Sequence, residues 1–419
     1  MNSLHLREAS TTEDVPLTAD QARWLAGRGH TQVAAALRPG RTTGCFDVTA
    51  GNIVGAVSAH GLDVVVEPKL PVGSLMWLVG YAAAGLRIQP RAEITTAPWV
   101  EAMAELFAGV AEEATRPGLL RGYWQVNEQE TTLRGRIRMA DQIAHHHGRL
   151  HPLELTRDEF GTDITENRIV RAALQVLADA LAVPGSVRPG SPVPARIRRA
   201  LRAFDGVTVL SRGAPLPAWR RSSLNERYHH LLELCELVLG GQGLDPRAGD
   251  VSTRGLLLDL ATVFEAAVAR ALRESCQDVI VDAQRSDAYV TGVPRFQLRP
   301  DVVLSRGGEV LTVLDTKYKR ATPTSGDMQQ MITYATFHRV RDVHLVYAEP
   351  LGQDRAQQLP ITGTGVVVHL HGIDLVGAPE DFLARVGGLA TAVAQAATVP
   401  SCQDGPVTGT SAAVSLREP

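Results

Sequence analysis

Two aspartates near residue 300 are spaced so that their side chains can act together. Asp301 precedes the short apolar run 302–304, and Asp315 follows the apolar run 310–314. A Gly-Gly pair lies between the runs, so we predict adjacent strands of a hairpin with both carboxylates near one end of the sheet. Proteins hold Mg2+ with one or two carboxylates plus waters and substrate phosphate. The spacing therefore predicts a Mg2+ site.

Lys317 lies two positions after Asp315 on the same predicted strand, so both side chains point to one face. Its ammonium can orient an attacking water or offset charge on phosphorus, while the metal lowers the pKa of that water. This chemistry is phosphodiester hydrolysis. The spacing P-D-x(13)-D-x-K resembles the signature of the PD-(D/E)xK nuclease superfamily. A surface hairpin that happens to carry the same residues is the alternative.

Lysine is rare in this chain. Its 42 basic residues are all arginine except Lys69, Lys317 and Lys319. Arginine replaces lysine wherever a generic cation suffices, so the remaining lysines are candidates for positions that need a compact ammonium. Chance clustering of surface lysines is the alternative for the two that lie together.

Two predicted helices carry further candidate groups. Glu265 lies in a predicted apolar helix, where a lone carboxylate is costly unless it meets a cation or a metal. It is a candidate third acidic ligand; the alternative is a solvent-facing Glu265 beside Arg270 or Arg273. Gln330 and Tyr334 share one helical face at i, i+4, for which an ordinary polar helix edge is the alternative.

The chain resembles the McrC family, the nuclease subunits of McrBC modification-dependent restriction systems. The resemblance covers most of the chain and is more specific than the nuclease signature alone. It rests on these motifs: Val66–Leu70 (VEPKL), Leu133–Ile137 (LRGRI), Asp163–Ile169 (DITENRI), Leu314–Lys319 (LDTKYK) with Asp301 upstream, and Gln330–Tyr334 (QMITY).

The resemblance implies a Mg2+-dependent endonuclease of a type IV restriction system, which cleaves DNA together with a partner. The implied partner is a hexameric, McrB-like AAA+ GTPase that recognises modified, methylated DNA, translocates on it and is stimulated by the nuclease subunit. The chain has no phosphate-binding Gly-x(4)-Gly-Lys-Ser/Thr loop, so we expect the nucleotide motor on another chain.

The predicted roles in the site are as follows. Asp301 and Asp315 bind Mg2+, Glu265 supports the metal or the water, Lys317 positions the water, and Gln330 steadies the lysine or the DNA backbone. A non-catalytic regulator of an AAA+ partner is one alternative, although such an adaptor has no need of the intact acid and lysine set. A stand-alone DNA repair nuclease is another, and it would cleave without any GTPase.

A chain of 419 residues and 45.0 kDa predicts two or three cores. We expect the α/β class, with a C-terminal PD-(D/E)xK restriction-endonuclease-like domain preceded by an α+β module and a helical middle region. The predicted units are 1–125, which we expect to dock the partner, the helical region 126–245, the nuclease domain 250–390 and a disordered tail 391–419.

The apolar periodicity predicts the elements that position the site. The predicted helices are 19–37, 73–84, 256–275 and 327–339. The predicted strands are 3–8, 52–57, 63–68, 278–283, 301–305, 310–315 and 343–347.

Composition narrows the setting. A formal net charge of −3 gives no global positive field, although a balanced chain can still carry a local basic groove. Four distant cysteines disfavour a disulfide framework and fit a reducing cytoplasm. No apolar stretch is long enough to span a bilayer and no signal peptide is present, so we expect a cytoplasmic protein without membrane contact.

Two polar clusters are weaker candidates. Arg196, Arg198, Arg199 and Arg202 lie on one predicted helix and would form a phosphate-contacting stripe, but a solvated helical face is the favoured interpretation. The run at 145–147 with His151 would bind a transition metal only with further ligands. None lies at suitable spacing, so a solvated polar run is favoured.

Overall fold

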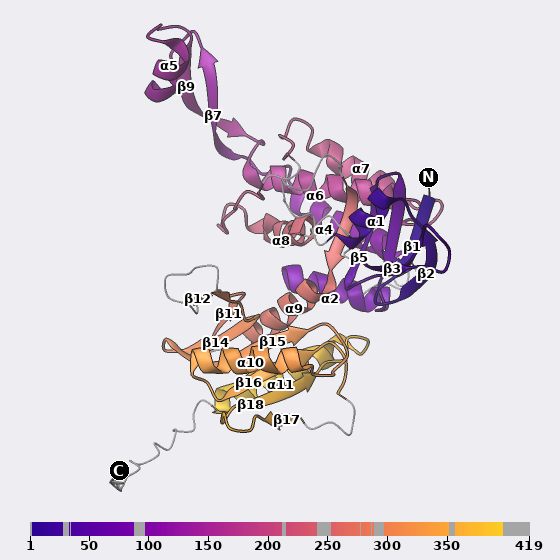
Figure 1. Ribbon diagram of the computed structural model, residues 1–419. Coiled ribbons are helices and arrows are strands. Elements are labelled where there is room, and N and C mark those ends of the chain that lie inside the picture. The colour runs from indigo at the N-terminus through magenta and orange to yellow at the C-terminus, as the bar shows by residue number, and fades with distance from the viewer. Residues whose placement is uncertain are drawn as a thin grey trace, which may run out of the picture.

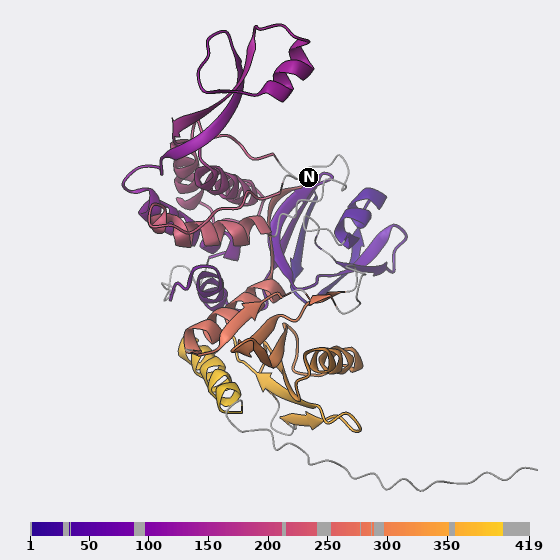
Figure 2. The same cartoon turned by 90° about the vertical axis from the view of Figure 1, so that its left-hand side faces the viewer.

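The computed structural model describes residues 2–27, 33, 35–87, 97–211, 215–240, 253–276, 278–285, 287–288, 297–351 and 357–396. Figures 1 and 2 show sheets near the N-terminus, a layer of helices from which a long arm projects, and a C-terminal sheet at the end opposite the arm. One hydrophobic core runs from the helical layer into the C-terminal part. The chain is thus a mixed α/β protein, as predicted.

The larger N-terminal sheet has the order β1-β6-β5-β10. Its strands are β1 (Asn2–Arg7), β5 (Ile53–Ala59), β6 (Leu62–Glu67) and β10 (Arg254–Asp259). β5 and β6, both predicted as strands, pair antiparallel, whereas β10 comes from the predicted unit 250–390 and pairs antiparallel with β5. The predicted boundary at residue 250 therefore does not coincide with the edge of this sheet.

β10 also corrects a predicted helix. The sequence predicts a helix from residue 256, but Leu256, Leu257 and Leu258 lie in a strand that is buried on both faces. Helix α9 (Leu260–Ser275) follows, and the side chain of Asp259 caps it by accepting a hydrogen bond from the amide of Ala261 at 2.9 Å. A short continuous apolar run does not distinguish a buried strand from a helix.

A smaller sheet packs beside the first, with the order β2-β4-β3. Its strands are β2 (Thr11–Pro16), β3 (Ala36–Pro39) and β4 (Cys45–Thr49). Helix α1 (Ala19–Ala26) begins at a capping box formed by Thr18 and Gln21. The prediction of a helix over 19–37 is too long, because α1 ends at Gly27 and residues 36–39 form a strand.

The helical layer contains most of the core. Its helices are α2 (Val72–Ala84), α4 (Trp99–Thr115), α6 (Thr165–Leu181), α7 (Val193–Ala203) and α8 (His229–Gly240), with a short 3-10 turn at Glu226–Tyr228. The amphipathic pattern of α6 buries one stripe, including Ile169, Leu174 and Leu177, against α4, α7 and α8.

The middle region is not purely helical, which corrects the prediction for 126–245. Residues 122–161 form an arm built from β7 (Gly122–Glu130), β8 (Arg136–Ile137), α5 (Met139–His146) and β9 (Leu153–Gly161), in the sheet order β7-β9-β8. In β7, exposed residues alternate with half-buried ones and none is fully buried. A ribbon without a buried face lacks the strong apolar alternation by which strands are predicted.

The C-terminal sheet has the order β11-β14-β15-β16-β18-β17. Its strands are β11 (Ile280–Ala283), β14 (Val302–Arg306), β15 (Glu309–Lys317), β16 (Asp342–Tyr347), β17 (Gln358–Pro360) and β18 (Val367–Gly372), with a separate pair β12 (Asp287–Ala288) and β13 (Gln297–Leu298). Helix α10 (Ser325–His338) covers one face, while α9 and α11 (Pro379–Ala396) cover the other. The predicted strands and the α10 helix of this part are confirmed.

Helix α11 extends past the predicted start of the tail. Residues 391–396, which the sequence places in the tail, are helical, and Val393 is buried. The remainder of the predicted tail lies outside the described residues. Within the described part of the chain, no helix is long and apolar enough to cross a membrane.

Candidate active site and projecting arm

The β14–β15 hairpin brings the two predicted aspartates together. Its turn, Gly307-Gly308, has positive φ angles of 59° and 90°, as a two-residue hairpin turn requires. A register shift between Leu304 and Ser305 separates the turn from the rest of the ladder, in which Val302 pairs with Leu314, so Asp301 and Asp315 lie next to this pair on opposite strands at the same end. The predicted convergence of these carboxylates is therefore present in the fold.

Asp315 is deeply buried, with 2% of its surface exposed. Burial, and then the neighbouring charge of Asp301, raise the pKa of Asp315 to about 6, although the Lys317 ammonium opposes this rise. Oδ2 of Asp315 is paired with the Lys317 ammonium, and no other polar group of the described residues binds it. This buried oxygen has spare capacity for a cation.

A chain of hydrogen bonds fixes the lysine. Nζ of Lys317 donates to Oε1 of Gln330 at 3.0 Å, and Nε2 of Gln330 donates to the Tyr334 hydroxyl at 2.9 Å. The Tyr334 hydroxyl donates in turn to the backbone oxygen of Arg299 at 3.1 Å. Gln330 and Tyr334 thus share a helical face as predicted, and that face carries the lysine's support.

Asp301 has a partner that the sequence analysis did not single out. Its Oδ2 accepts hydrogen bonds from both the amide of Thr316, at 2.6 Å, and the Thr316 hydroxyl, at 2.7 Å. These bonds fix the carboxylate. Thr316 lies between two predicted site residues, but strand alternation directs its side chain away from theirs, so sequence pattern alone gave it no role.

Glu265 projects from α9 toward the same two aspartates. Burial, and then the charge of Asp301, raise the pKa of Glu265 to about 7, and Asp315 adds to the rise. The side chain of Gln284 hydrogen-bonds to Glu265 and opposes it. The alternative of a solvent-facing Glu265 beside an arginine does not agree with this placement. Gln284 has a positive φ of 54°, a feature that no sequence pattern announced.

These carboxylates could bind a hard divalent cation only together with waters or phosphate oxygens as further ligands. No cluster of three or more His, Cys, Asp or Glu side chains in the described ranges forms a complete metal cage. Mg2+ does not need one, since it usually keeps several waters and takes one or two carboxylates plus phosphate oxygens. Asp301 and Asp315, two carboxylates at one end of the hairpin, match that requirement.

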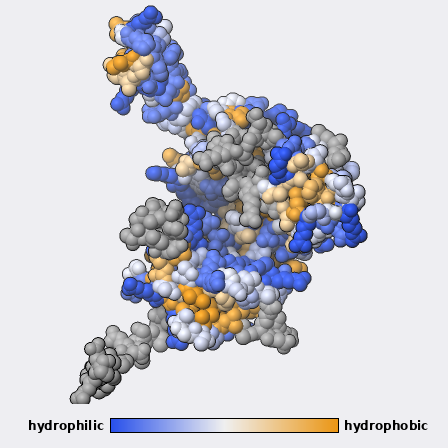
Figure 3. Space-filling model, in the orientation of Figure 1, coloured by the Kyte–Doolittle hydropathy of each residue, from blue (hydrophilic) through white to orange (hydrophobic). Residues whose placement is uncertain are grey.

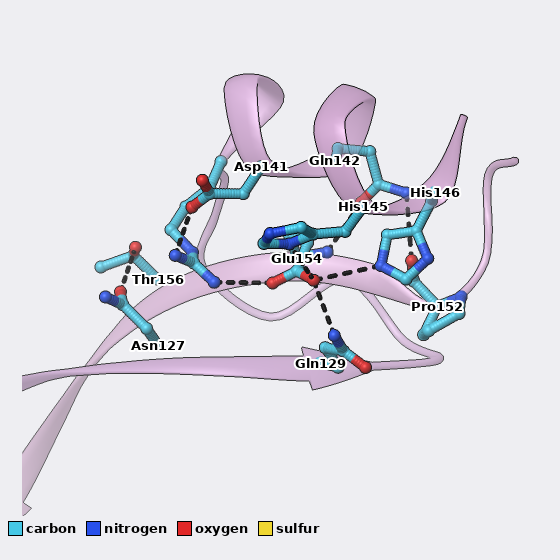
Figure 4. A network of polar contacts seen from close by, with 10 residues as sticks. Asn127, Gln129, Asp141, Gln142, His145, His146, Pro152, Glu154 and Thr156 are labelled. Carbon is cyan, nitrogen blue, oxygen red and sulfur yellow. Dashed lines mark hydrogen bonds and ion pairs between the residues drawn. The ribbon is translucent and has the colours of Figure 1, made fainter. Parts of the chain in front are cut away.

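A network of polar contacts around the buried carboxylate of Glu154 stabilises the arm near its end (Figure 4). Glu154 of β9 accepts hydrogen bonds from Arg138 at 2.6 Å and Gln129 at 2.7 Å, and contacts His145 and His146 at 3.3 and 3.1 Å. This network ties α5 to the strands. The histidine run therefore has a structural carboxylate partner instead of a metal set.

Gly135 explains the LRGRI motif of the arm. It has a φ of +101°, and a Cβ at this position would collide with the backbone oxygen of Thr156 on β9. Glycine is thus required where the chain crosses against β9 before β8. The motif is a structural feature of the arm and contributes no group to the aspartate cluster.

The DITENRI motif fastens the arm at its base. Asn167, fully buried in α6, donates from Nδ2 to the backbone oxygens of Leu120 at 2.9 Å and Thr162 at 2.7 Å, which flank the arm. Asp163 accepts two hydrogen bonds from the guanidinium of Arg168, both at 2.9 Å. The two ends of the arm are therefore held by one helix.

The end of the arm exposes several large apolar side chains. Figure 3 shows apolar surface there, as it also does on the N-terminal and C-terminal parts of the molecule. Met139 and Ile143 lie one turn apart on α5 and are 60% and 63% exposed, and Leu150 is 78% exposed. Exposed apolar clusters of this kind mark interaction sites.

The arginine helix is in part a structural feature. Arg196 of α7 forms ion pairs with Glu105 and Glu112 of α4, which leaves it unsuited to bind phosphate. The other three arginines, Arg198, Arg199 and Arg202, are exposed, which agrees with the favoured interpretation of a solvated helical face.

Comparisons with known proteins agree with this description. The family described as McrBC 5-methylcytosine restriction system component matches residues 48–348. The fold is shared with a chain in a solved structure, the refined half-complex from a tetradecameric assembly of Thermococcus gammatolerans McrB AAA+ hexamers with bound McrC. The TM-score is 0.50 and the sequence identity 16%, and the match covers 93% of this chain and 100% of that one. The cryo-EM structure of the Thermococcus gammatolerans McrBC complex gives a TM-score of 0.36 and 19% identity over 65% and 88%. No curated protein matches.

Proposed function

Because the chain belongs to the family of McrBC 5-methylcytosine restriction system components, we propose that it is the nuclease subunit of a modification-dependent restriction system. It hydrolyses DNA phosphodiesters in the cytoplasm with Mg2+, using a C-terminal domain of the PD-(D/E)xK type. The observation that carries the proposal is the convergence of Asp301, Asp315 and Lys317 at the end of one hairpin. A structural hairpin gains nothing from burying two like charges side by side.

The residues divide the chemistry between them. Asp301 and Asp315 hold the cation, which when bound supplies Lewis-acid activation of water and of the phosphoryl oxygen. The Lys317 ammonium, fixed by Gln330, orients the attacking water and offsets charge that develops on the phosphate. Glu265, with a pKa of about 7, is able to exchange a proton with water near neutral pH.

The partner is a hexameric AAA+ GTPase that delivers modified DNA. This part of the proposal is supported by the fold shared with a chain that is bound to McrB AAA+ hexamers. The arm is the best candidate for the contact, because it projects from the body and ends in exposed Met139, Ile143 and Leu150. This moves the expected docking surface from residues 1–125 to the arm.

A cleavage assay tests the proposal. The purified chain, an AAA+ GTPase partner, GTP, Mg2+ and methylated DNA should together produce cleavage, which omission of the partner or of Mg2+ should prevent. Asp315→Asn should abolish cleavage. Asp342→Asn is the matched control, since Asp342 lies on the neighbouring strand and pairs with His369. Cleavage by Asp315→Asn at the wild-type rate would exclude this site, and cleavage without partner would favour a stand-alone nuclease.

A further inference from the structure

Four polar residues meet where the N-terminal sheet contacts the active-site strand. Glu8 follows β1, Lys69 belongs to the VEPKL motif after β6, Tyr318 directly follows Lys317, and Glu349 follows β16. Lys69 is one of three lysines in the chain, and the catalytic proposal gives it no role. The four groups thus link segments far apart in the sequence.

Glu8 is the buried centre of this group. Its side chain is fully buried, and its Oε2 accepts a hydrogen bond from the backbone amide of Lys69 at 3.0 Å. Burial raises the pKa of Glu8, and the Lys69 charge opposes that rise. A carboxylate in such a position needs a nearby cation, because an unpaired buried charge is strongly destabilising.

The Lys69 ammonium contacts both parts of the molecule. Nζ lies 3.9 Å from Oε1 of Glu8 and 3.6 Å from Oε1 of Glu349. It also lies 4.5 Å from the centre of the Tyr318 ring, a cation–π distance. Tyr318 is 3% exposed and packs against Phe264 of α9. Burial of the phenol raises the pKa of Tyr318, and the charge of nearby Glu8 raises it further.

The position of Tyr318 determines that of the residue before it. Lys317 is the last residue of β15 and Tyr318 follows it in a bend, so a Tyr318 held in the interface fixes the backbone where the strand ends and from which the Lys317 side chain projects. The backbone oxygen of Lys317 accepts hydrogen bonds from Lys319 at 2.8 Å and from Ala348, the neighbour of Glu349, at 3.1 Å. Lys69 therefore contacts Tyr318, which follows Lys317 in the chain, and Glu349, which follows its hydrogen-bond partner Ala348.

We propose that Lys69 is a positioning residue: its ammonium holds Tyr318 and Glu349 against the N-terminal sheet and thereby places the Lys317 ammonium in the active site. The inference rests on the proposed nuclease function for its kinetic consequence, but its structural consequence is independent of that function. It makes the N-terminal part of the chain a component of the active site's geometry, although that part supplies no catalytic group.

The scarcity of lysine provides a direct measurement. Full-length chain labelled with 13C at lysine Cε should give three side-chain signals, which Lys→Arg variants assign. Glu8→Gln/Lys69→Met is the main test variant, since it removes the ammonium without leaving a buried charge. We expect it to remain folded, to shift the Lys317 signal, and to lower kcat for cleavage by about tenfold while KM for DNA stays unchanged. Arg41→Met, which removes an exposed ion pair with Glu13, is the control.

A conservative variant of Lys69 distinguishes a positioning role from mere neutralisation of the Glu8 charge. Lys69→Arg keeps a cation over the Tyr318 ring and should retain most of the cleavage rate. If Glu8→Gln/Lys69→Met shows an unmoved Lys317 signal and wild-type kcat, Lys69 serves only to neutralise Glu8, and the inference fails. If the wild-type chain with partner and Mg2+ does not cleave at all, the nuclease proposal fails, and the Lys317 signal alone decides the role of Lys69.

Discussion

The folded chain holds Asp315 and Glu265 at pKa values of about 6 and about 7, since both are buried beside Asp301. Ionising either group therefore costs more free energy in the folded chain than in the unfolded one. A bound divalent cation offsets this cost by supplying positive charge where the carboxylates are close together. The folded chain should therefore be less stable without a divalent cation in this site than with one, as expected of a ligand-binding site.

In EDTA, the contribution of Asp315 and Glu265 to the free energy of unfolding should fall as pH rises from about 4 to about 7. Within this window the two raised carboxyls bind more protons in the folded chain than in the unfolded chain, so raising pH favours unfolding. Thermal melts at pH 5 and pH 8 check this contribution. Glu265→Gln should raise the melting temperature more at pH 8 than at pH 5, and an equal effect at both would contradict the assignment.

Lys317→Arg should lose nearly all cleavage activity. The Lys317 ammonium lies between Asp315 and Gln330, and a planar guanidinium presents its donors in a different geometry and a larger volume. Lys319→Arg is the matched control, because Lys319 is more exposed and pairs with Asp327 at the start of α10. Full activity of Lys317→Arg would show that any cation suffices.

The residues that sequence pattern predicted in the site are those whose spacing follows the strand period. Asp315 and Lys317 are two apart, and the Gly-Gly turn forms the hairpin that brings Asp301 to the same end, although the register shift between Leu304 and Ser305 was not predictable from the pattern. Thr316 and Gln284 could not be predicted this way. Their roles depend on a hydrogen bond across the hairpin and on a loop with positive φ, both of which are set by tertiary structure.

The same contrast holds for the elements. The C-terminal hairpin was predictable because its strands are apolar and its turn is specific. The arm was not, since it is stabilised by the polar network around Glu154 instead of an apolar stripe. β10 was mistaken for helix because an apolar run such as Leu256–Leu258 suits either element until its neighbours are known.

Asn167→Ala should loosen the arm without unfolding the body. The change leaves the backbone oxygens of Leu120 and Thr162 without their amide donor, at a cost of about 1–3 kcal/mol. Hydrogen exchange should speed up at both ends of the arm, and partner stimulation should weaken. Asn127→Ala, which removes an exposed bond to Thr156 within the arm, is the control and should change neither.

Ile143→Glu should abolish partner binding while leaving the melting temperature almost unchanged. The side chain is 63% exposed, so a charge there costs little in the isolated chain but is costly in an apolar contact. Co-sedimentation with the AAA+ partner measures binding. Val209→Glu, at a site 60% exposed but outside the arm, controls for charge alone. Normal binding by Ile143→Glu would place the contact elsewhere.

At the scale of the whole molecule, the arm and the aspartate cluster lie in different parts, with the helical layer between them (Figure 1). This separation predicts that Asp315→Ala loses cleavage yet stimulates GTP hydrolysis by the partner as well as the wild type does. Phosphate release by the partner, measured with and without each variant, checks this. Loss of stimulation in Asp315→Ala would show that the two activities share one site.

The pairing of β10 with β5 also constrains how this protein is made. The two strands are neighbours in one sheet, yet the ribosome must synthesise the helical layer and the arm before β10 emerges. Until then β5 presents an unpaired edge, a known template for aggregation. Chains released before residue 254 therefore cannot complete the sheet whose strands lead to Glu8 and Lys69. A gene truncated at the predicted boundary near residue 250 should accordingly yield insoluble protein.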